Sequence, residues 1–362
     1  MGRLVLIRHG ESEGNRDRIF THTPEVPLTD AGHAQVRAAA EWVAARYRPV
    51  AVVSSPFLRA RQTAAILAER LALAVRVEEE LRELRYAFKV FAPYAGVRKV
   101  SIFGSARTRP DAAAYRTAHE FARRIAAEGY MVITGAGSGI MRACQEGAGR
   151  ERSFGVNIRL PFEQEPNEII SKDAKLTTFR YFFTRKLIFM KEADAAALFP
   201  GGFGTHDEAY ECLTLVQTGK TKPMPIVFVD APRGKYWKTW ERYVEEHLLR
   251  HHLISKEDMA LFKVTTSVDQ AVEEITRFYR VYHSARIVGD KFVIRLLRPI
   301  ASAHLVELQA KFDDILTGPA ELAPGPGEQE LSEFPELPRL ILPFNRSSYS
   351  RLRQLIDFIN QL

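Results

Sequence analysis

Apolar and polar positions along the chain fall into short blocks that predict strands followed by helices. Short apolar runs rich in β-branched residues are typical of buried strands, and apolar residues recurring every three or four positions are typical of amphipathic helices. In the first part of the chain the patterns predict strands at 4–7, 50–54 and 75–78 and helices at 31–47 and 59–71. Strands that alternate with helices indicate a parallel α/β arrangement.

The middle of the chain continues this alternation over a longer stretch. Strands are expected at 99–103, 130–134, 153–157, 195–199 and 225–229, and helices at 112–128, 140–150, 179–191, 205–218, 237–250 and 268–279. Such a succession predicts a doubly wound, Rossmann-like parallel sheet with helices on both faces.

The last part of the chain has a different pattern, which predicts a small α+β cap. Its expected elements are a strand at 286–297, a helix at 303–316, a long loop at 317–338, a strand at 339–343 and a helix at 349–361. The chain of 362 residues is long enough for two or three domains. We therefore expect a partial α/β segment at 1–85, a Rossmann-like domain at 86–280 and the cap at 281–362.

Charge and composition limit the classes of function. The net charge is +7, and the basic excess lies in residues 86–280, with 29 basic and 23 acidic side chains. An anionic small substrate explains this bias, and weak nucleic-acid affinity is an alternative. Specific nucleic-acid binding is not expected, because no cluster of lysines and arginines is interleaved with aromatic residues.

The cysteine content and the hydropathy of the chain indicate where in the cell the protein is expected. The two cysteines, Cys144 and Cys212, form no CxxC or Cys/His spacing, so no metal site is expected. Few cysteines, no signal-peptide pattern at the N-terminus and no apolar run of bilayer length predict a cytoplasmic protein without membrane attachment.

The most informative segment is Pro-Gly-Gly-Phe-Gly-Thr-His-Asp-Glu at residues 200–208, between an expected strand and an expected helix. Its glycines allow a sharp turn and close approach of the backbone to a ligand. Thr205 stands where the helix is expected to begin, and a helix N-terminus binds anions such as phosphate. Glu208 then places a carboxylate beside that anion. Alternatively, Thr205 and Glu208 form a capping box that only stabilises the helix start, and both interpretations can hold together.

Glycines follow three of the expected parallel strands, so their loops should meet at one edge of the sheet and line one crevice. They are Gly104, then Gly135, Gly137 and Gly139, then Gly201, Gly202 and Gly204. The second group is GxGxG rather than GxGxxG, and no acidic residue follows at the distance needed to bind a ribose. This pattern argues against a dinucleotide site.

Four motifs occur in order in the middle block: Ser-Ile-Phe-Gly-Ser-Ala-Arg at 101–107, Thr-Gly-Ala-Gly-Ser-Gly-Ile-Met at 134–141, Thr-Arg-Lys at 184–186, and the loop at 200–208. Together they resemble the LOG family, the cytokinin-activating phosphoribohydrolases that are often labelled lysine decarboxylases. The resemblance implies hydrolysis of the N-glycosidic bond of nucleoside 5′-monophosphates, such as AMP or a cytokinin riboside monophosphate, to a free base and ribose 5-phosphate.

The resemblance also implies roles for individual residues. Arg185 and Glu208 would be the catalytic pair. The nucleotide and its phosphate would be bound by Gly104, Ser105, Gly135, Gly137, Gly139, Met141, Lys186, Gly201, Gly202, Gly204 and Thr205. Neither pyridoxal phosphate nor a metal is implied as cofactor. The active site of the family lies near a subunit interface, which implies a homo-oligomer.

The implied chemistry agrees with the residue types. Cleavage of the bond builds positive charge on the ribose, which a carboxylate such as Glu208 can stabilise while it orients water. Arg185 is permanently charged and can bind a phosphate or hold the carboxylate. The alternatives are that Arg185 and Lys186 lie on a solvated helix face, and that the scaffold is a nucleotide sensor without turnover.

The N-terminal block carries two further motifs, Leu-Ile-Arg-His-Gly-Glu-Ser at 6–12 and Ser-Ser-Pro-Phe-Leu-Arg-Ala-Arg-Gln-Thr-Ala at 54–64. They resemble the histidine phosphatase (phosphoglycerate mutase-like) family. That resemblance implies phosphorylation of His9, phosphoryl binding by Arg8 and Arg59, and an acid at Glu83. The second His-Gly dipeptide of the family does not occur later in the chain. We therefore interpret this block as a truncated phosphatase segment with a vestigial site, and phosphatase activity through His9 as the alternative.

Overall fold

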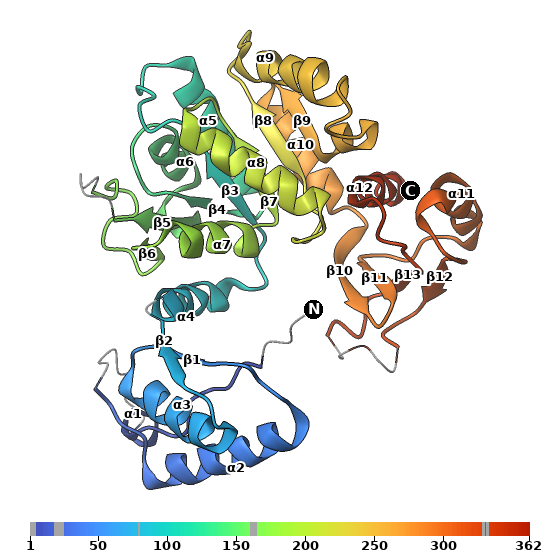
Figure 1. The fold of residues 1–362 in the computed structure, drawn as a ribbon. Coiled ribbons are helices and arrows are strands. Elements are labelled where there is room, and N and C mark those ends of the chain that lie inside the picture. The colour runs from blue at the N-terminus through green and yellow to red at the C-terminus, as the bar shows by residue number, and fades with distance from the viewer. Residues whose placement is uncertain (1–4, 18–24, 79, 160–164, 328–329, 331–332) are drawn as a thin grey trace. The chain divides into compact units, whose positions relative to one another are not determined.

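The computed structural model describes residues 5–17, 25–78, 80–159, 165–327, 330 and 333–362. The chain divides into two compact units, Met1–Ala92 (unit 1) and Pro93–Leu362 (unit 2). Each unit is described by itself (Figure 1).

Unit 1 is a small α/β segment whose sheet is short. Strands β1 (Val52–Ser54) and β2 (Val75–Val77) pair in parallel, and the helices are α1 (Glu13–Arg16), α2 (Asp30–Arg46), α3 (Leu58–Leu71) and α4 (Glu80–Phe91). Helices α2 and α3 enclose a small core that contains Val36, Val43 and Leu67. The sequence patterns did not predict helix α4, and the boundary expected after residue 85 lies inside it.

The strand predicted at 4–7 does not form within the described residues 5–7, and this prediction is wrong. Leu6 is 85% exposed, and β1 pairs only with β2 in the described part of the unit. An extended segment needs a neighbouring strand to satisfy its backbone groups and cover its side chains, and no described strand pairs with this one. Residue 4 lies outside the described residues.

Unit 2 contains a seven-stranded parallel sheet in its described residues, which confirms the Rossmann-like α/β fold. The strand order is β6-β5-β4-β3-β7-β8-β9. The strands are β3 (Lys99–Phe103), β4 (Met131–Thr134), β5 (Ser153–Ile158), β6 (Leu176–Phe179), β7 (Ala195–Leu198), β8 (Ile226–Val229) and β9 (Phe262–Thr265). The outermost strands, β6 and β9, were not predicted, because they are short, partly exposed and interrupted by polar residues.

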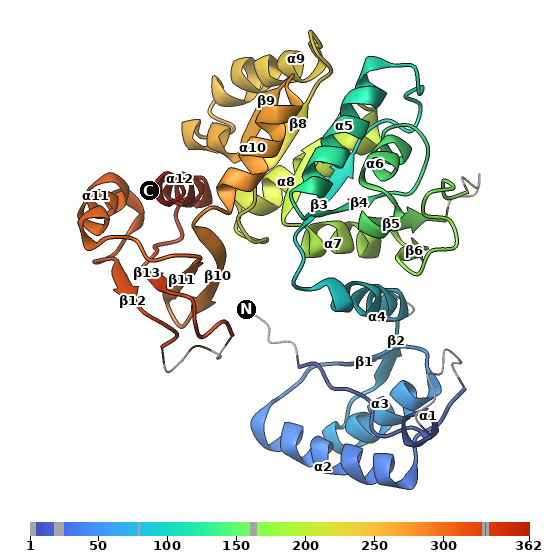
Figure 2. The same ribbon diagram turned by 180° about the vertical axis from the view of Figure 1, so that it is seen from behind.

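Helices cover both faces of this sheet. They are α5 (Ala113–Ala127), α6 (Ile140–Ala148), α7 (Phe182–Glu192), α8 (Phe203–Gln217), α9 (Tyr236–Tyr243) and α10 (Val268–Phe278). Figure 1 shows α7 and α8 on the near face, and Figure 2 shows α5, α6 and α10 on the opposite face. Successive strands run outward from β3 to β6, and the chain then returns to place β7 on the other side of β3. The loops after β3 and β7 therefore diverge, as they do at the ligand-binding switch point of doubly wound sheets.

The C-terminal part of unit 2 is an antiparallel sheet in the order β10-β11-β13-β12, with two helices packed on it. Its elements are β10 (Tyr282–Val288), β11 (Lys291–Leu296), α11 (Ser302–Phe312), β12 (Glu321–Ala323), β13 (Arg339–Leu342) and α12 (Tyr349–Ile359). The single strand predicted at 286–297 is a hairpin instead, because the chain reverses at Gly289, which has a φ of +61°.

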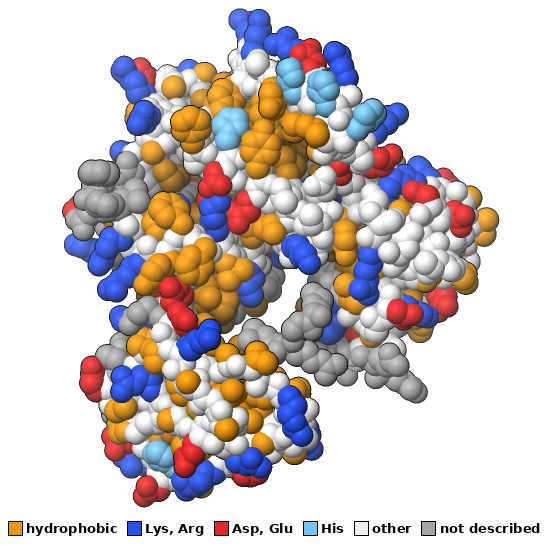
Figure 3. Space-filling model, viewed as in Figure 1, with side chains coloured by type: hydrophobic (Ala, Val, Ile, Leu, Met, Phe, Trp, Pro, Cys, Tyr) orange, Lys and Arg blue, Asp and Glu red, His pale blue; other side chains and the backbone are white. Residues whose placement is uncertain are grey.

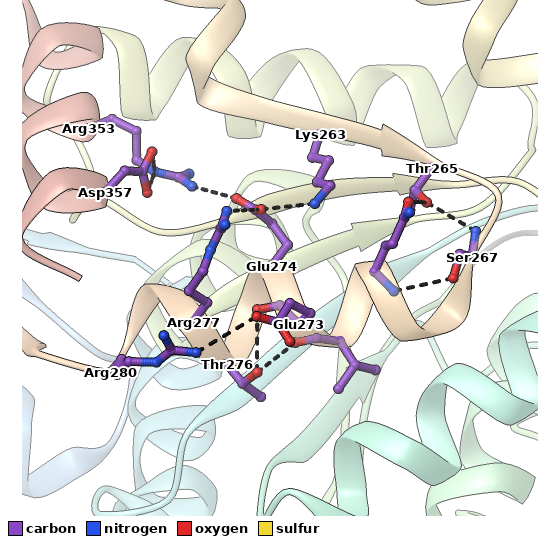
Figure 4. Close-up of polar contacts among 12 residues, drawn as sticks. Lys263, Thr265, Ser267, Glu273, Glu274, Thr276, Arg277, Arg280, Arg353 and Asp357 are labelled. Carbon is purple, nitrogen blue, oxygen red and sulfur yellow. Dashed lines mark hydrogen bonds and ion pairs between the residues drawn. The ribbon is translucent and has the colours of Figure 1, made fainter. Parts of the chain in front are cut away.

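One hydrophobic core runs through both parts of unit 2. Phe278 of α10, Ile294 of β11 and Leu352 of α12 belong to the same buried cluster. A buried ion-pair network adds to this connection (Figure 4): Glu274 of α10 accepts hydrogen bonds from Arg277, 2.8 Å away, and from Arg353 of α12, also 2.8 Å away. The predicted cap is therefore part of the compact unit that contains the Rossmann-like sheet.

Candidate functional site

A cavity of about 840 Å³ lies at the carboxyl ends of the central strands of unit 2. Its walls come from the loop after β3, the loop after β4, the start of α7, the loop after β7 with the first turns of α8, and the start of α9. It is lined by Ile102, Phe103, Gly104, Ser105, Ala106, Arg107, Gly135, Met141, Phe182, Arg185, Gly201, Gly202, Phe203, Gly204, Thr205, His206, Asp207, Glu208 and Tyr236. The cavity thus occupies the switch point between β3 and β7.

Helix α8 points its N-terminus into this cavity. The helix begins at Phe203, and Gly202 is its N-cap, with no side-chain cap bond. The prediction that the helix begins at Thr205 is therefore wrong, and so is the capping-box alternative. The extended backbone of Gly202 lets the helix start earlier than the threonine suggested, and Thr205 is its third residue. The Thr205 amide donates to the Gly202 carbonyl at 3.0 Å, whereas the amides of Phe203 and Gly204, which line the cavity, have no side-chain cap.

The glycines of the loop after β7 differ in what they do. A Cβ at Gly201 would lie 2.1 Å from Thr205 Oγ1 and 3.0 Å from the Ser105 amide, so only glycine fits there. At Gly202 and Gly204 a Cβ would meet no described atom within 4 Å. The first glycine lets the two loops approach each other, and the other two leave their backbone accessible from the cavity.

Arg185 enters the cavity from α7 and is partly buried. Its Nε donates to the carbonyl of Val156, 2.9 Å away, and its guanidinium lies 5.1 Å from the centre of the Phe189 ring. Gly135 makes room for it, because a Cβ there would lie 2.6 Å from the guanidinium. Burial lowers the pKa of Arg185, and the negative charge of Glu208 opposes that effect.

Glu208 reaches the same cavity from α8 and is 7% exposed. Its Oε2 has no hydrogen-bond partner among the described residues. Burial raises the pKa of Glu208 to about 7, although the charges of Lys186 and Arg185 oppose the rise. A carboxyl group that titrates near neutrality and has an unsatisfied oxygen is typical of a group that acts on a ligand.

Three of the predicted nucleotide-binding residues are not among the described residues that line the cavity: Gly137, Gly139 and Lys186. The Lys186 ammonium instead pairs with Asp207, 2.8 Å away, and with Glu211, 3.0 Å away. The carbonyl of Gly137 accepts a hydrogen bond from Asn167 at 2.8 Å. Asn167, which the motifs did not single out, is buried and holds the second glycine loop in place.

Several cavity residues were not predicted as site residues. Arg107 and His206 lie within the quoted motifs, and Phe182 stands just before the Thr-Arg-Lys motif, so inspection of the motifs and their neighbours could have suggested them. Tyr236 lies in none of the motifs, and only the fold brings it to the cavity. Its hydroxyl donates to the carbonyl of Gly201 at 2.5 Å and lies 2.6 Å from His206 Nε2.

Unit 1 has its own hollow of about 1060 Å³, to which Arg8, His9 and Arg85 contribute. His9 Nδ1 lies 2.8 Å from the carbonyl of Gly10. Burial lowers the pKa of His9, and the charges of Arg59, Arg85 and Arg8 lower it further. The hydrogen bond with the Gly10 carbonyl acts in the opposite direction and raises it. Arg59 acts on His9 electrostatically and is 3% exposed, but neither it nor Glu83 is among the described residues that line the hollow. Arg85 was not predicted.

The two units thus define a class of protein: a Rossmann-like sheet with a glycine-loop cavity, preceded by a short α/β segment with a histidine among arginines. Comparison with family models agrees with this division. Residues 139–275 match the family described as "Possible lysine decarboxylase", and residues 4–91 match the "Histidine phosphatase superfamily (branch 1)". Both predicted resemblances are confirmed, and the chain joins a LOG-like segment to a histidine-phosphatase-like segment. Both matches indicate an enzyme.

Curated relatives match short stretches of the chain. A glucosyl-3-phosphoglycerate phosphatase of Mycobacterium tuberculosis (strain CDC 1551 / Oshkosh) is 41% identical over 81 residues, which are 22% of this chain and 36% of that protein. A 2,3-bisphosphoglycerate-dependent phosphoglycerate mutase of Lactobacillus johnsonii is 41% identical over 71 residues, 19% of this chain and 31% of that protein. The chain covers 22% of the length of an uncharacterised Mycobacterium bovis protein that is 43% identical over 81 residues.

Among solved structures, the molybdenum cofactor carrier protein of Chlamydomonas reinhardtii covers 50% of this chain and 97% of its own length, with 16% identity and a TM-score of 0.35. In the part of the chain that the structure describes, no helix combines the length and apolar character needed to cross a membrane. The same described residues contain no group of three or more histidine, cysteine, aspartate or glutamate side chains placed to hold a metal ion.

Proposed function

We propose that unit 2 hydrolyses the N-glycosidic bond of nucleoside 5′-monophosphates and releases a free base and ribose 5-phosphate. The observation that carries this proposal is Glu208: a buried carboxyl with an unsatisfied oxygen and a pKa raised to about 7 by burial. It shares one cavity with the N-terminus of α8, which has no side-chain cap, and with the partly buried cation of Arg185.

The proposed reaction follows from this arrangement. The 5′-phosphate binds at the α8 N-terminus, where the accessible backbone of Gly202 and Gly204 meets the positive end of the helix dipole. As the bond between C1′ and the base nitrogen breaks, the electron pair leaves with the base and positive charge develops on the ribose. The Glu208 carboxylate stabilises that charge and orients a water molecule. The water oxygen bonds to C1′, and a proton from the water ends on the departing base.

The proposal is tested by incubating the full chain with AMP and separating the products by chromatography. Adenine with ribose 5-phosphate supports the proposal. Glu208→Ala should abolish adenine release while AMP binding, measured by calorimetry, is retained. Turnover at the wild-type rate in that variant would reject the role of Glu208. A panel that includes cytokinin riboside monophosphates and other purine and pyrimidine monophosphates then identifies the preferred base.

Two other functions remain as outcomes of the same assay. Binding of AMP without any product would identify a nucleotide sensor. Inorganic phosphate without adenine would favour a phosphatase in unit 1, where His9 lies among the positive charges of Arg8, Arg59 and Arg85. We expect His9→Ala to leave adenine release unchanged, because His9 does not belong to the unit 2 cavity.

We further propose that unit 2 forms a homo-oligomer through the face that carries α7 and α8. Hydrophobic side chains gather on this face in Figure 3. Phe182, Phe183 and Leu187 of α7 are about half exposed, and Phe203 of α8 is 97% exposed. Phe182 and Phe203 also line the cavity, so a second copy bound here would help to enclose the substrate. Light scattering after size-exclusion chromatography should show a smaller species for Phe183→Asp than for the wild type.

A further inference from the structure

We propose that Tyr236 and His206 are positioning residues that hold the carbonyl of Gly201 and thereby fix the anion-binding loop of the cavity. This inference rests on the proposed function, because it assigns the anion to the loop after β7. We call the pair the Tyr236–His206 clamp. Neither residue belongs to the catalytic pair, and Tyr236 comes from a different strand–helix connection, the one after β8.

The hydrogen bonds of the clamp run in one direction. The Tyr236 hydroxyl has a single hydrogen, which it donates to the Gly201 carbonyl, 2.5 Å away. His206 Nε2 lies 2.6 Å from the same hydroxyl oxygen, so it must be the protonated ring nitrogen and donate to it. The chain of donors therefore runs from His206 through Tyr236 to Gly201. Each bond in such a chain polarises the next and strengthens it.

The carbonyls of Pro200 and Gly201, the first two residues of the loop, are held by different partners. On one side the Ser105 amide donates to the carbonyl of Pro200 at 3.1 Å, and Gly201 packs against Thr205. On the other side, the hydroxyl of Tyr236 holds the carbonyl of Gly201. The carbonyls of Pro200 and Gly201 are therefore both held by hydrogen bonds. These bonds fix the orientation of the two peptide groups and of the Gly202 N-cap that follows them.

Tyr236 is itself held firmly enough to act as an anchor. It is the first residue of α9, whose start is fixed by buried Asp230, because the amide of Trp237 donates to that carboxylate at 2.9 Å. The Tyr236 ring meets the Trp237 ring edge-on at 4.8 Å, and the His206 ring lies 5.4 Å from Trp237. Loss of the hydroxyl alone therefore leaves these ring contacts in place.

The test uses Tyr236→Phe in the full chain, with Tyr243→Phe as the matched control. Tyr243 ends the same helix, is 49% exposed and is not among the described residues that line the cavity. One neutral hydrogen bond corresponds to a change of about twofold to tenfold in an equilibrium constant. We expect ribose 5-phosphate, titrated calorimetrically, to bind Tyr236→Phe that much more weakly than the control. The KM for AMP should rise by the same factor with kcat unchanged.

His206→Phe supplies a second variant, because it keeps an aromatic ring and removes the Nε2 donor. It should weaken ribose 5-phosphate binding in the same direction and by less than Tyr236→Phe. Equal affinity of Tyr236→Phe and the control for ribose 5-phosphate would overturn the clamp while leaving the proposed function intact. A fall in kcat with unchanged KM would also overturn it, because the hydroxyl would then act in the chemical step. Failure of the wild-type chain to bind either AMP or ribose 5-phosphate would overturn both proposals.

Discussion

Burial of the Glu208 carboxyl should make unit 2 less stable as the pH rises. The folded-state pKa is about 7 against an ordinary value of 4.5, so the folded protein binds this proton more tightly than the unfolded chain does. The stabilising contribution of the protonated form is fully present below pH 4.5 and is lost as the pH rises through about 7. The gap corresponds to about 3 kcal/mol of unfolding free energy.

Glu208→Gln removes this titration and keeps the size of the side chain. The wild type should lose about 1 kcal/mol of this contribution by about pH 5 and about 3 kcal/mol by about pH 8. The variant should therefore gain about 2 kcal/mol of stability relative to the wild type between these two pH values. Urea denaturation followed by circular dichroism at both pH values measures the change, and any effect of the new amide that does not depend on pH cancels in the comparison.

Asp207→Asn is the matched control, since it removes the same charge from the adjacent position, where the side chain is 60% exposed. Its stability relative to the wild type should change far less between the two pH values. If Glu208→Gln and Asp207→Asn changed in parallel, or if Glu208→Gln showed no dependence on pH, the buried and unsatisfied state of Glu208 would be refuted.

Three further predictions follow from the site and the core. Adenine release should increase with pH through about 7, because the Glu208 carboxylate is the proposed active form; a kcat/KM that falls over this range would mean that the group acts as an acid. Gly135→Ala should displace the Arg185 guanidinium and lower kcat/KM by about tenfold or more. The urea midpoint should change little, because the atoms that must move, at the end of Arg185 and the sulfur of Met141, belong to flexible side chains. Glu274→Gln should destabilise unit 2 by about 2 kcal/mol in urea denaturation, since buried Arg353 would keep Asp357 but lose its charged hydrogen bond to Glu274. Glu273→Gln, at a side chain that is 59% exposed, should have little effect.

Much of the cavity could be predicted because its residues follow buried strands. Gly104 and Gly201 come directly after apolar runs, and parallel strands bring their carboxyl ends to one edge of the sheet. Glu208 could be predicted from its place in the segment 200–208, beside the expected anion site. Arg185 could be found only through the resemblance, because a helix position alone does not tell whether a charged side chain is buried. The structure places both in the cavity, which a solvated helix face would not do.

The failures have physical causes that lie outside any local pattern. The apolar segment that contains Leu6 has the composition of a strand, but strand formation depends on a neighbour that unit 1 does not supply in its described residues. Tyr236 reaches Gly201 across 35 positions of the chain, and no spacing rule connects them. The helix start at Phe203 depends on the backbone of Gly202, whereas the side chain of Thr205 suggested a later one.

The shared core of unit 2 has a consequence for synthesis of the protein in the cell. Leu352, Leu355 and Ile356 of α12 are completely buried in the cluster that also contains residues of β3 and α5. The sheet that carries the glycine loops therefore cannot complete its packing on the ribosome until α12 has left the exit tunnel. During translation the nascent chain exposes this apolar surface, so chaperones that bind such surfaces should associate with it until α12 docks.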